Sequence, residues 1–207
     1  MNYLSVENIS KSYGERVLFD NVSFGINKDQ KIAFIAKNGS GKTTIMNMIN
    51  GLDEPDTGQV IIRKEINMAF LSQNNNLQDE LTIEENIFAS DNEILKVIER
   101  YEKALENPND EEAYQRAFDD MDRHNAWDFE TQFKQILYKL KLEDLKMKVK
   151  NMSGGQKKRL SLAIILISKP DLLILDEPTN HLDLEMIEWL EDYFAKENIT
   201  LFMVTHD

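Results

Sequence analysis

A buried strand that runs directly into a glycine-rich loop and then a helix constrains this fold more than any other feature. Residues 31–36 read KIAFIA, an apolar run of strand length, and residues 37–44 read KNGSGKTT. The apolar spacing of the following IMNMINGL predicts a helix with Gly51 as its C-cap. A strand, a loop and a helix in this order indicate an α/β fold with a mostly parallel sheet.

The loop from residue 37 to residue 44 ends in the G-x-G-K-T pattern of a phosphate-binding P-loop. Its backbone N–H groups and the positive end of the helix attract phosphate, Lys42 reaches the β- and γ-phosphates, and the Thr43 hydroxyl ligates Mg²⁺. The full pattern has glycine where this chain has Ala36, so either the backbone there is β-like or nucleotide binding is weakened. A plain glycine-rich turn is the alternative. The predicted nucleotide-binding residues of the loop are Lys37, Asn38, Gly39, Ser40, Gly41, Lys42, Thr43 and Thr44.

The remaining pattern alternates between strands at both ends of the chain and helices in the middle. Strands are predicted at YLSVENI, RVLFDNVSFGI, VIIR and NMAFLSQ, and again at DLLILD and TLFMVTH near the end. Residues 83–150 have helical spacing, another helix follows MSGGQ, and a further one covers residues 184–194. The sequence therefore predicts a sheet interrupted by an inserted helical subdomain.

Two adjacent acids end the most apolar of these strands, LLILD, which is followed by EPTNHLD. A buried parallel strand delivers its last residue to the edge of the sheet where the P-loop lies, so Asp176 can hold Mg²⁺ through water. Glu177 then faces the γ-phosphate and can polarise the attacking water as a general base. A strand that simply ends in an acidic turn is the alternative.

The segment MSGGQ provides a second helix start suited to an anion. Ser153 is a candidate N-cap, and Gly154 and Gly155 leave the backbone N–H groups accessible. An ordinary N-cap is one interpretation. The other is that Ser153 and Gly155 serve a nucleotide bound to another copy or another domain, because one nucleotide does not need two such helix starts from one chain.

Composition limits the class of protein. The 207 residues contain no cysteine and are 42% hydrophobic, and no apolar run approaches the roughly 20 residues that cross a bilayer, so we expect a cytoplasmic globular protein. The net charge of −13 is uneven, with 17 acids against 5 bases in residues 79–130 and 9 bases against 2 acids in residues 134–159. Solvated helix faces explain both blocks without a nucleic-acid footprint.

These motifs together resemble the nucleotide-binding domain of the ATP-binding cassette (ABC) superfamily over the whole chain. KNGSGKTT matches Walker A, Gln73 the Q-loop, MSGGQ the signature, LLILDEP Walker B, Asp183 the D-loop and His206 the switch histidine. The resemblance implies a P-loop NTPase core with an N-terminal antiparallel β subdomain, and a head-to-tail pairing in which Ser153, Gly154, Gly155 and Gln156 contact ATP on a second cassette. It also implies that Tyr13 stacks on adenine, unless it is a core tyrosine, that Gln73 assists catalysis and metal binding, and that His206 contacts the γ-phosphate.

The stretch DEPTNHLD resembles the ABC-F class, in which two cassettes on one chain act on ribosomes, and this likeness rests on Asn180 and His181. It implies a Mg²⁺-dependent ATPase whose partners are ATP, a second cassette and the ribosome, without membrane insertion. An ATPase subunit of a membrane transporter and an ATP-binding switch with little turnover are the alternatives. We expect one C-terminally truncated domain, with residues 1–73 and 169–207 forming the core and residues 74–168 the helical subdomain with an arm-like insert.

Overall fold

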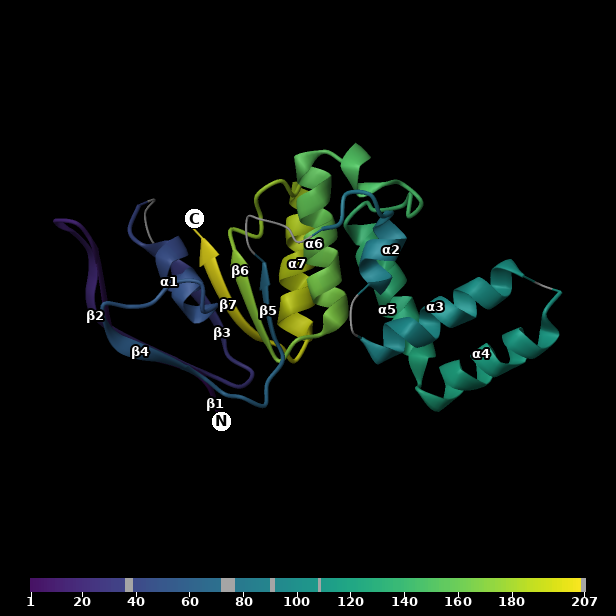
Figure 1. Cartoon of the computed structure of the whole chain (residues 1–207), viewed down its shortest axis with the longest axis horizontal. Coiled ribbons are helices and arrows are strands. Elements are labelled where there is room, and N and C mark those ends of the chain that lie inside the picture. The colour runs from purple at the N-terminus through teal and green to yellow at the C-terminus, as the bar shows by residue number, and fades with distance from the viewer. Residues whose placement is uncertain (36–38, 72–76, 90–91, 108, 206–207) are drawn as a thin grey trace. The chain divides into compact units, whose positions relative to one another are not determined.

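The computed structural model of the chain describes residues 1–35, 39–71, 77–89, 92–107 and 109–205 (Figure 1). The chain divides into two compact units, one formed by residues 1–74 and 169–207 and the other by residues 75–168. In the described residues the first unit holds all the named strands, and the second unit is built from helices. The predicted α/β fold, with an antiparallel sheet, a parallel sheet and a helical insertion, is confirmed.

Three antiparallel strands form the first sheet in the order β2-β1-β4, and they are β1 (Asn2–Tyr13), β2 (Arg16–Asn27) and β4 (Thr57–Ile62). The chain returns from β1 into β2 through a tight turn at Gly14, whose φ of +60° suits glycine. Tyr13 and Arg16 pair across this turn. Both side chains therefore belong to the same end of the sheet.

Four parallel strands form the second sheet in the order β3-β7-β6-β5, and they are β3 (Lys31–Ile35), β5 (Met68–Leu71), β6 (Leu172–Asp176) and β7 (Thr200–Thr205). Every residue of β6 is buried, as a continuous apolar run predicts for an inner strand of a parallel sheet. Parallel strands end at the same edge, so the acidic end of β6 lies on the edge where β3 also ends.

Helix α1 (Lys42–Ile49) packs between the two sheets (Figure 1). One buried cluster contains Ile9 of β1, Met46 of α1, Ile174 of β6 and Phe202 of β7, which fixes the helix against both sheets. The C-cap of α1 is Asn50, and Gly51 is the residue after it with φ of +71°. The predicted end of the helix is thus displaced by one residue, because the left-handed conformation that favours glycine falls just beyond the cap.

The second unit consists of α2 (Ile83–Phe88), α3 (Glu93–Glu106), α4 (Glu111–Arg123), α5 (Ala126–Lys139), a 3₁₀ turn η1 (Val149–Asn151) and α6 (Gly154–Ser168). Helix α2 begins with a capping box in which Thr82 and Glu85 bond reciprocally. Helices α3, α4 and α5 meet at an aromatic cluster with ring centroids 5.0 to 6.2 Å apart, formed by Tyr101, Tyr114, Phe118 and Trp127. The amphipathic helices predicted for this region are confirmed.

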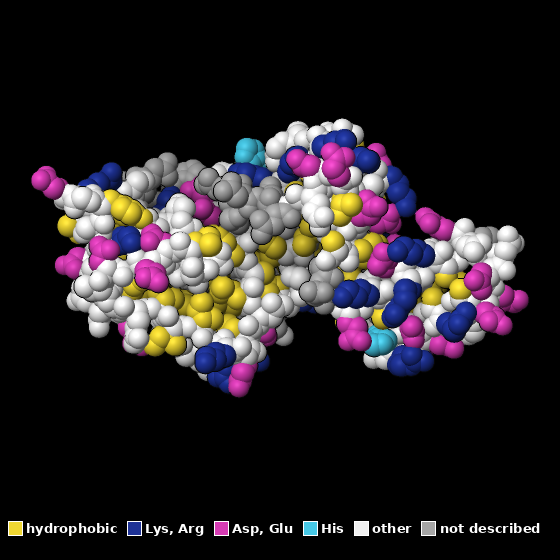
Figure 2. Space-filling view, in the orientation of Figure 1, with side chains coloured by type: hydrophobic (Ala, Val, Ile, Leu, Met, Phe, Trp, Pro, Cys, Tyr) yellow, Lys and Arg dark blue, Asp and Glu magenta, His cyan; other side chains and the backbone are white. Residues whose placement is uncertain are grey.

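Several charges of the two blocks pair with each other inside this helical unit. Ion pairs join Lys146 to Glu84 at 2.7 Å, Lys150 to Glu80 at 2.8 Å and Lys157 to Asp79 at 2.6 Å. Figure 2 shows acidic and basic side chains interspersed over the helices rather than gathered by sign. These ion pairs lie on the exposed surface, as the interpretation of the two blocks as solvated faces expects. No helix in the described ranges is long and apolar enough to cross a membrane.

Helix α7 (Leu184–Lys196) belongs to the first unit and buries Met186, Leu190 and Phe194 along one face. Its N-cap is Asp183, the predicted D-loop acid. The Asp183 Oδ1 accepts a hydrogen bond from the Met186 N–H at 3.0 Å. This side chain therefore has a local role in starting α7.

Candidate functional site

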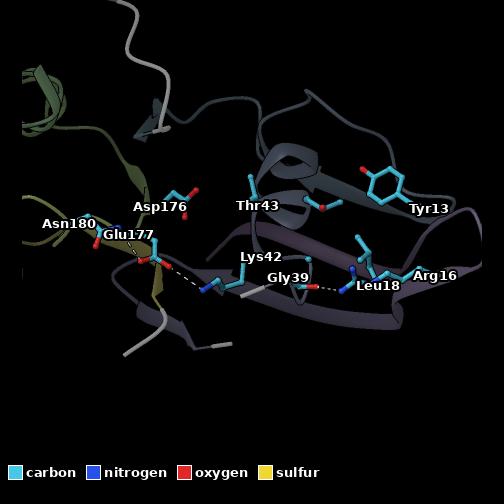
Figure 3. Close-up of a pocket in the computed structure, with 11 residues that line it drawn as sticks. Tyr13, Arg16, Leu18, Gly39, Lys42, Thr43, Asp176, Glu177 and Asn180 are labelled. Carbon is cyan, nitrogen blue, oxygen red and sulfur yellow. Dashed lines mark hydrogen bonds and ion pairs between the residues drawn. The ribbon is translucent and has the colours of Figure 1, made fainter. Parts of the chain in front are cut away.

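A cavity of about 550 Å³ opens in the first unit where α1 begins and β6 ends (Figure 3). The residues that line it are Tyr13, Arg16, Leu18, Gly39, Gly41, Lys42, Thr43, Thr44, Asp176, Glu177 and Asn180. Most of these are predicted site residues, drawn from the P-loop, from Walker B and from the end of β1. The structure thus brings three separate segments of the sequence to one cavity.

The first turn of α1 lies at this cavity. Gly41 is the N-cap with φ of +93°, and Gly39 has φ of +77°. A Cβ atom at Gly41 would lie 2.9 Å from the Phe19 ring, so this position requires glycine for both conformation and space. A helix start with a glycine N-cap offers backbone N–H groups and the positive end of the helix to an anion.

Lys42 is buried, with only 7% of the residue exposed, and its ammonium group points at a carboxylate. Its Nζ lies 3.1 Å from Glu177 Oε1, and the side chain of Glu177 is itself only 13% exposed (Figure 3). A buried charge pair of this kind is costly to separate unless another charge replaces the lost partner. The candidate phosphate-binding lysine and the candidate general base are therefore in direct contact in this structure.

Glu177 is held by its backbone as well as by its side chain. Its φ of +50° is unusual for a residue other than glycine and costs on the order of 1–3 kcal/mol. Its N–H donates to the Val204 carbonyl at 2.9 Å, and Asn180 Nδ2 donates to Glu177 Oε2 at 3.3 Å. Contacts from β7 and from the turn after β6 thus fix a strained backbone that turns this carboxylate toward Lys42.

Asp176 and Thr43 are the candidate metal ligands among the described residues. Asp176 is the last residue of β6, is 9% exposed and lines the cavity together with Thr43 of α1. No group of three or more His, Cys, Asp or Glu side chains in the described chain is arranged to hold a metal on its own. One carboxylate and one hydroxyl fit Mg²⁺, which keeps several waters and takes oxygen ligands from phosphates.

Tyr13 is 55% exposed, so the alternative of a core tyrosine is wrong. Its ring lines the cavity with Leu18 and Thr44 (Figure 3). The Tyr13 hydroxyl donates to Asp53 Oδ2 at 2.9 Å, and this bond, followed by burial, raises the pKa of the phenol. Tyr13 therefore stays a neutral donor and presents an aromatic face at the cavity.

Arg16 is a cavity residue that the sequence did not single out. Its Nη2 donates to the Gly39 carbonyl at 2.9 Å, which ties the start of β2 to the glycine-rich loop (Figure 3). The signal was present in the hairpin pattern, because a tight turn after Tyr13 places Arg16 opposite it. Leu18, two residues further along β2, also lines the cavity. Asn180 lines it as well, and its side chain bonds to Glu177.

The signature residues begin helix α6 of the other unit. Ser153 Oγ accepts from the Gln156 N–H at 3.3 Å, and Gln156 Oε1 accepts from the Ser153 N–H at 2.8 Å. The N-cap interpretation of Ser153 is thus borne out, in the form of a capping box. Gly154 and Gly155 form the first two residues of the helix, and the cavity described above is lined by the first unit alone.

Several predicted residues lie outside the described ranges. They are Lys37 and Asn38 of the loop, Gln73 and His206, and also Ala36, the departure from the P-loop pattern. Ser40 is described and exposed but is not among the residues that line the cavity.

A parallel sheet, a glycine-rich loop before a helix, and a lysine and two acids at one cavity define a P-loop nucleotide-binding domain. A family model described as "ABC transporter" matches residues 19–180, and the chain belongs to this family, whose domains bind ATP. The resemblance expected from the sequence is confirmed. A solved "ATP binding subunit of ABC transporter" has the same fold, with a TM-score of 0.67, 23% identity and coverage of 99% of this chain and 79% of that one.

Curated relatives extend the comparison. The chain is 41% identical to the "Uncharacterized ABC transporter ATP-binding protein YfmR" of Bacillus subtilis over 100% of its own length and 34% of the relative. It is 38% identical to "ABC transporter F family member 2" of Arabidopsis thaliana, covering 98% of this chain and 32% of the relative. It is 32% identical to the "Energy-dependent translational throttle protein EttA" of Mycobacterium tuberculosis, covering 98% and 38%. The chain thus spans about a third of the length of these relatives.

Proposed function

We propose that this chain is the ATP-binding and ATP-hydrolysing cassette of an ABC-F type protein. The observation that carries the proposal is the meeting of Lys42, Asp176 and Glu177 at one cavity beside the start of α1. Hydrolysis of a phosphoanhydride requires a cation that binds the phosphates, a carboxylate that holds a metal ion and a second carboxylate that takes a proton from water.

The described residues divide this work as follows. The N–H groups at the start of α1 hold phosphate oxygens, and Lys42 neutralises charge on the β- and γ-phosphates. Thr43 and Asp176 would hold Mg²⁺, which supplies a positive charge on the phosphate oxygens and fixes their geometry. Glu177 accepts the proton of the attacking water. By family resemblance, Gln73 and His206 complete the site around the γ-phosphate, and Ser153 to Gln156 act on a second cassette.

Nucleotide binding exchanges partners at the Lys42–Glu177 ion pair. The ammonium group leaves Glu177 Oε1, now 3.1 Å away, for the more highly charged phosphates. The carboxylate of Glu177, whose Oε2 accepts from Asn180, then takes a proton from the attacking water. The base is therefore neutralised by a lysine when no phosphate is present and is released by the substrate itself.

Replacing Lys42 by alanine is expected to lower ATP affinity by about 100-fold, because a charge-assisted bond contributes up to about 3 kcal/mol. Isothermal titration of the chain with ATP and Mg²⁺ measures the change. Lys64→Ala, which removes an exposed lysine in the turn between β4 and β5, is the matched control and should bind as the wild type does. Equal affinity in the Lys42→Ala and wild-type chains would exclude this cavity as the phosphate site.

The ABC-F assignment and the ribosome as a partner are supported by the relatives. The printed names of the relatives include an ABC transporter F family member and a translational throttle protein. Asn180, one of the two residues on which the ABC-F likeness depends, bonds to the candidate base Glu177. A transporter ATPase subunit and an ATP-dependent switch with little turnover remain the alternatives, and both use the same cavity.

Ribosome association separates these alternatives. In the full-length parent protein, Glu177→Gln is expected to hold ATP unhydrolysed and to sediment with ribosomes in the presence of ATP. Lys42→Ala, for which we expect about 100-fold weaker ATP binding, should remain in the supernatant at an ATP concentration that saturates only the Glu177→Gln protein. Sedimentation of the Glu177→Gln protein with membranes and not with ribosomes would favour the transporter interpretation.

A further inference from the structure

A charged network outside the cavity holds the hydroxyl of Tyr13. The Asp53 carboxylate accepts from the Tyr13 hydroxyl through Oδ2 at 2.9 Å and from Lys11 Nζ through Oδ1 at 2.9 Å. The Lys11 and Asp53 side chains are only 10% and 26% exposed. Asp53 lies outside the motifs that point to nucleotide binding, yet its two oxygens are both engaged in orienting groups beside the cavity.

Asp53 belongs to an acidic loop, residues 53–56, that follows α1 and is tied to the end of β1 along its length. Lys11 Nζ also donates to the Glu54 carbonyl at 2.5 Å. The Asp56 Oδ2 accepts from the Ser12 N–H at 2.7 Å, and the Asp56 N–H donates to the Ser10 carbonyl at 2.9 Å. The acidic loop is therefore a fixed support for Tyr13 and not a free surface turn.

The network is charged at neutral pH. The bonds from Lys11 and then from Tyr13 hold the pKa of Asp53 below its usual value, and the bond to Asp53 raises the pKa of Lys11. Lys11 Nζ also lies 5.5 Å from the centre of the Tyr13 ring, within cation–π range. Both the hydroxyl and one face of the ring thus have a fixed partner, which leaves the rest of the ring for the cavity.

We infer that Asp53, held by Lys11, is a positioning residue for the Tyr13 ring and sets the affinity of the cavity for the base-bearing end of a nucleotide. The inference rests on the proposed function, in which Tyr13 stacks on the base. An exposed tyrosine at a strand end loses rotational freedom when it binds a ligand, and a ring whose hydroxyl is already fixed loses less.

The position of Asp53 in the fold gives the network a second consequence. Lys42 begins α1 at the phosphate end of the cavity, and the acidic loop follows the other end of the same helix. Eight helical residues span about 12 Å. Helix α1 thus connects the phosphate-binding loop to the acidic loop that holds Tyr13. The length of this helix therefore sets the distance between the phosphate contacts and the base contacts.

Titration with two ligands separates positioning from general stability. Asp53→Ala is expected to weaken binding of ATP by about three- to ten-fold, a part of the loss on removing a stacking ring altogether. Binding of inorganic tripolyphosphate, which has no base, should remain within about two-fold of wild type because α1 and Lys42 are unchanged. Isothermal titration of the chain with each ligand in Mg²⁺ measures both affinities.

Three further variants test whether Asp53 acts on ATP binding through Tyr13. Asp53→Asn keeps an oxygen for the Tyr13 hydroxyl but loses the charge that holds Lys11, so it should recover part of the ATP affinity. In a Tyr13→Ala background, Asp53→Ala should cause no additional loss. Asp20→Asn is the matched control, since Asp20 accepts from a β1 hydroxyl, Ser10, at 2.8 Å but is not among the cavity residues. It should bind both ligands as the wild type does.

The outcomes are distinguishable. A loss for ATP alone in Asp53→Ala, absent in the Tyr13→Ala background, supports the positioning role. An equal loss for ATP and tripolyphosphate, or no loss for either, overturns it. If Tyr13→Ala itself binds ATP as tightly as the wild type, the stacking role in the proposed function fails; if only Asp53→Ala is unaffected, the present inference fails alone.

Discussion

Replacing Glu177 by glutamine is expected to lower the rate of ATP hydrolysis by about 10³-fold, within the range for loss of a general base. ATP binding should be at least as tight as before. The amide keeps the shape of the side chain but cannot take a proton from water, and it no longer holds Lys42 by charge. The measurements are phosphate release under steady-state conditions and isothermal titration with ATP, both in Mg²⁺.

The affinity part of this prediction follows from the geometry of the ion pair. In the wild-type chain the phosphates must displace a carboxylate 3.1 Å from Lys42 Nζ, whereas in the Glu177→Gln chain they displace a neutral amide. Glu185→Gln, an exposed acid in the first turn of α7, is the matched control and should change neither quantity. Unchanged turnover in Glu177→Gln would remove Glu177 as the base, and weaker ATP binding would argue against the exchange of partners.

The sequence predicted those parts of the fold and site that depend on local pattern. The apolar run of β6 had to be an inner strand, and a buried parallel strand has to end at the sheet edge where the P-loop lies. Once Lys42 was identified, this topology placed Asp176 and Glu177 beside it. The helices of the second unit were also predictable from the sequence, because each has its own amphipathic pattern.

Contacts between distant segments were not predictable in the same way. The Lys42–Glu177 ion pair joins residues 135 positions apart, and its strained Glu177 backbone is maintained by β7. Likewise, Asp53 reaches Tyr13 over 40 positions, and DEPD has the composition of an ordinary surface turn. Side-chain type and spacing carry little information about such pairs, because the fold decides which turn faces which strand.

The start of α6 explains only part of the signature segment. Ser153 and Gln156 form a capping box, so their residue types are explained by the start of α6 without any nucleotide. The cap does not account for Gly154, because glycine is a weaker helix former than alanine, by up to about 1 kcal/mol inside a helix. A Cβ atom at Gly154 would meet no described residue within 4 Å, so packing against the described part of the chain does not require glycine either. The proposed contact with a nucleotide on a second cassette would explain a residue without a side chain here.

The substitution Gly154→Glu tests whether the start of α6 acts on a second cassette. The fold should gain stability, because an acid in the first turn complements the helix dipole and glycine is a weak helix former. ATP turnover by paired cassettes should fall by up to about 10³-fold, because the negative charge of the new glutamate would face the phosphates bound to the partner cassette.

Thermal unfolding and phosphate release across a range of protein concentrations measure the two effects in the Gly154→Glu chain. Gly154→Gln, equal in length but uncharged, is the control and should lose less activity. Mixing Gly154→Glu with Lys42→Ala should restore turnover that neither variant has alone, because the mixed pair still has one intact phosphate loop facing one intact signature. Turnover that is independent of concentration and undiminished in a monomeric Gly154→Glu chain would contradict action in trans.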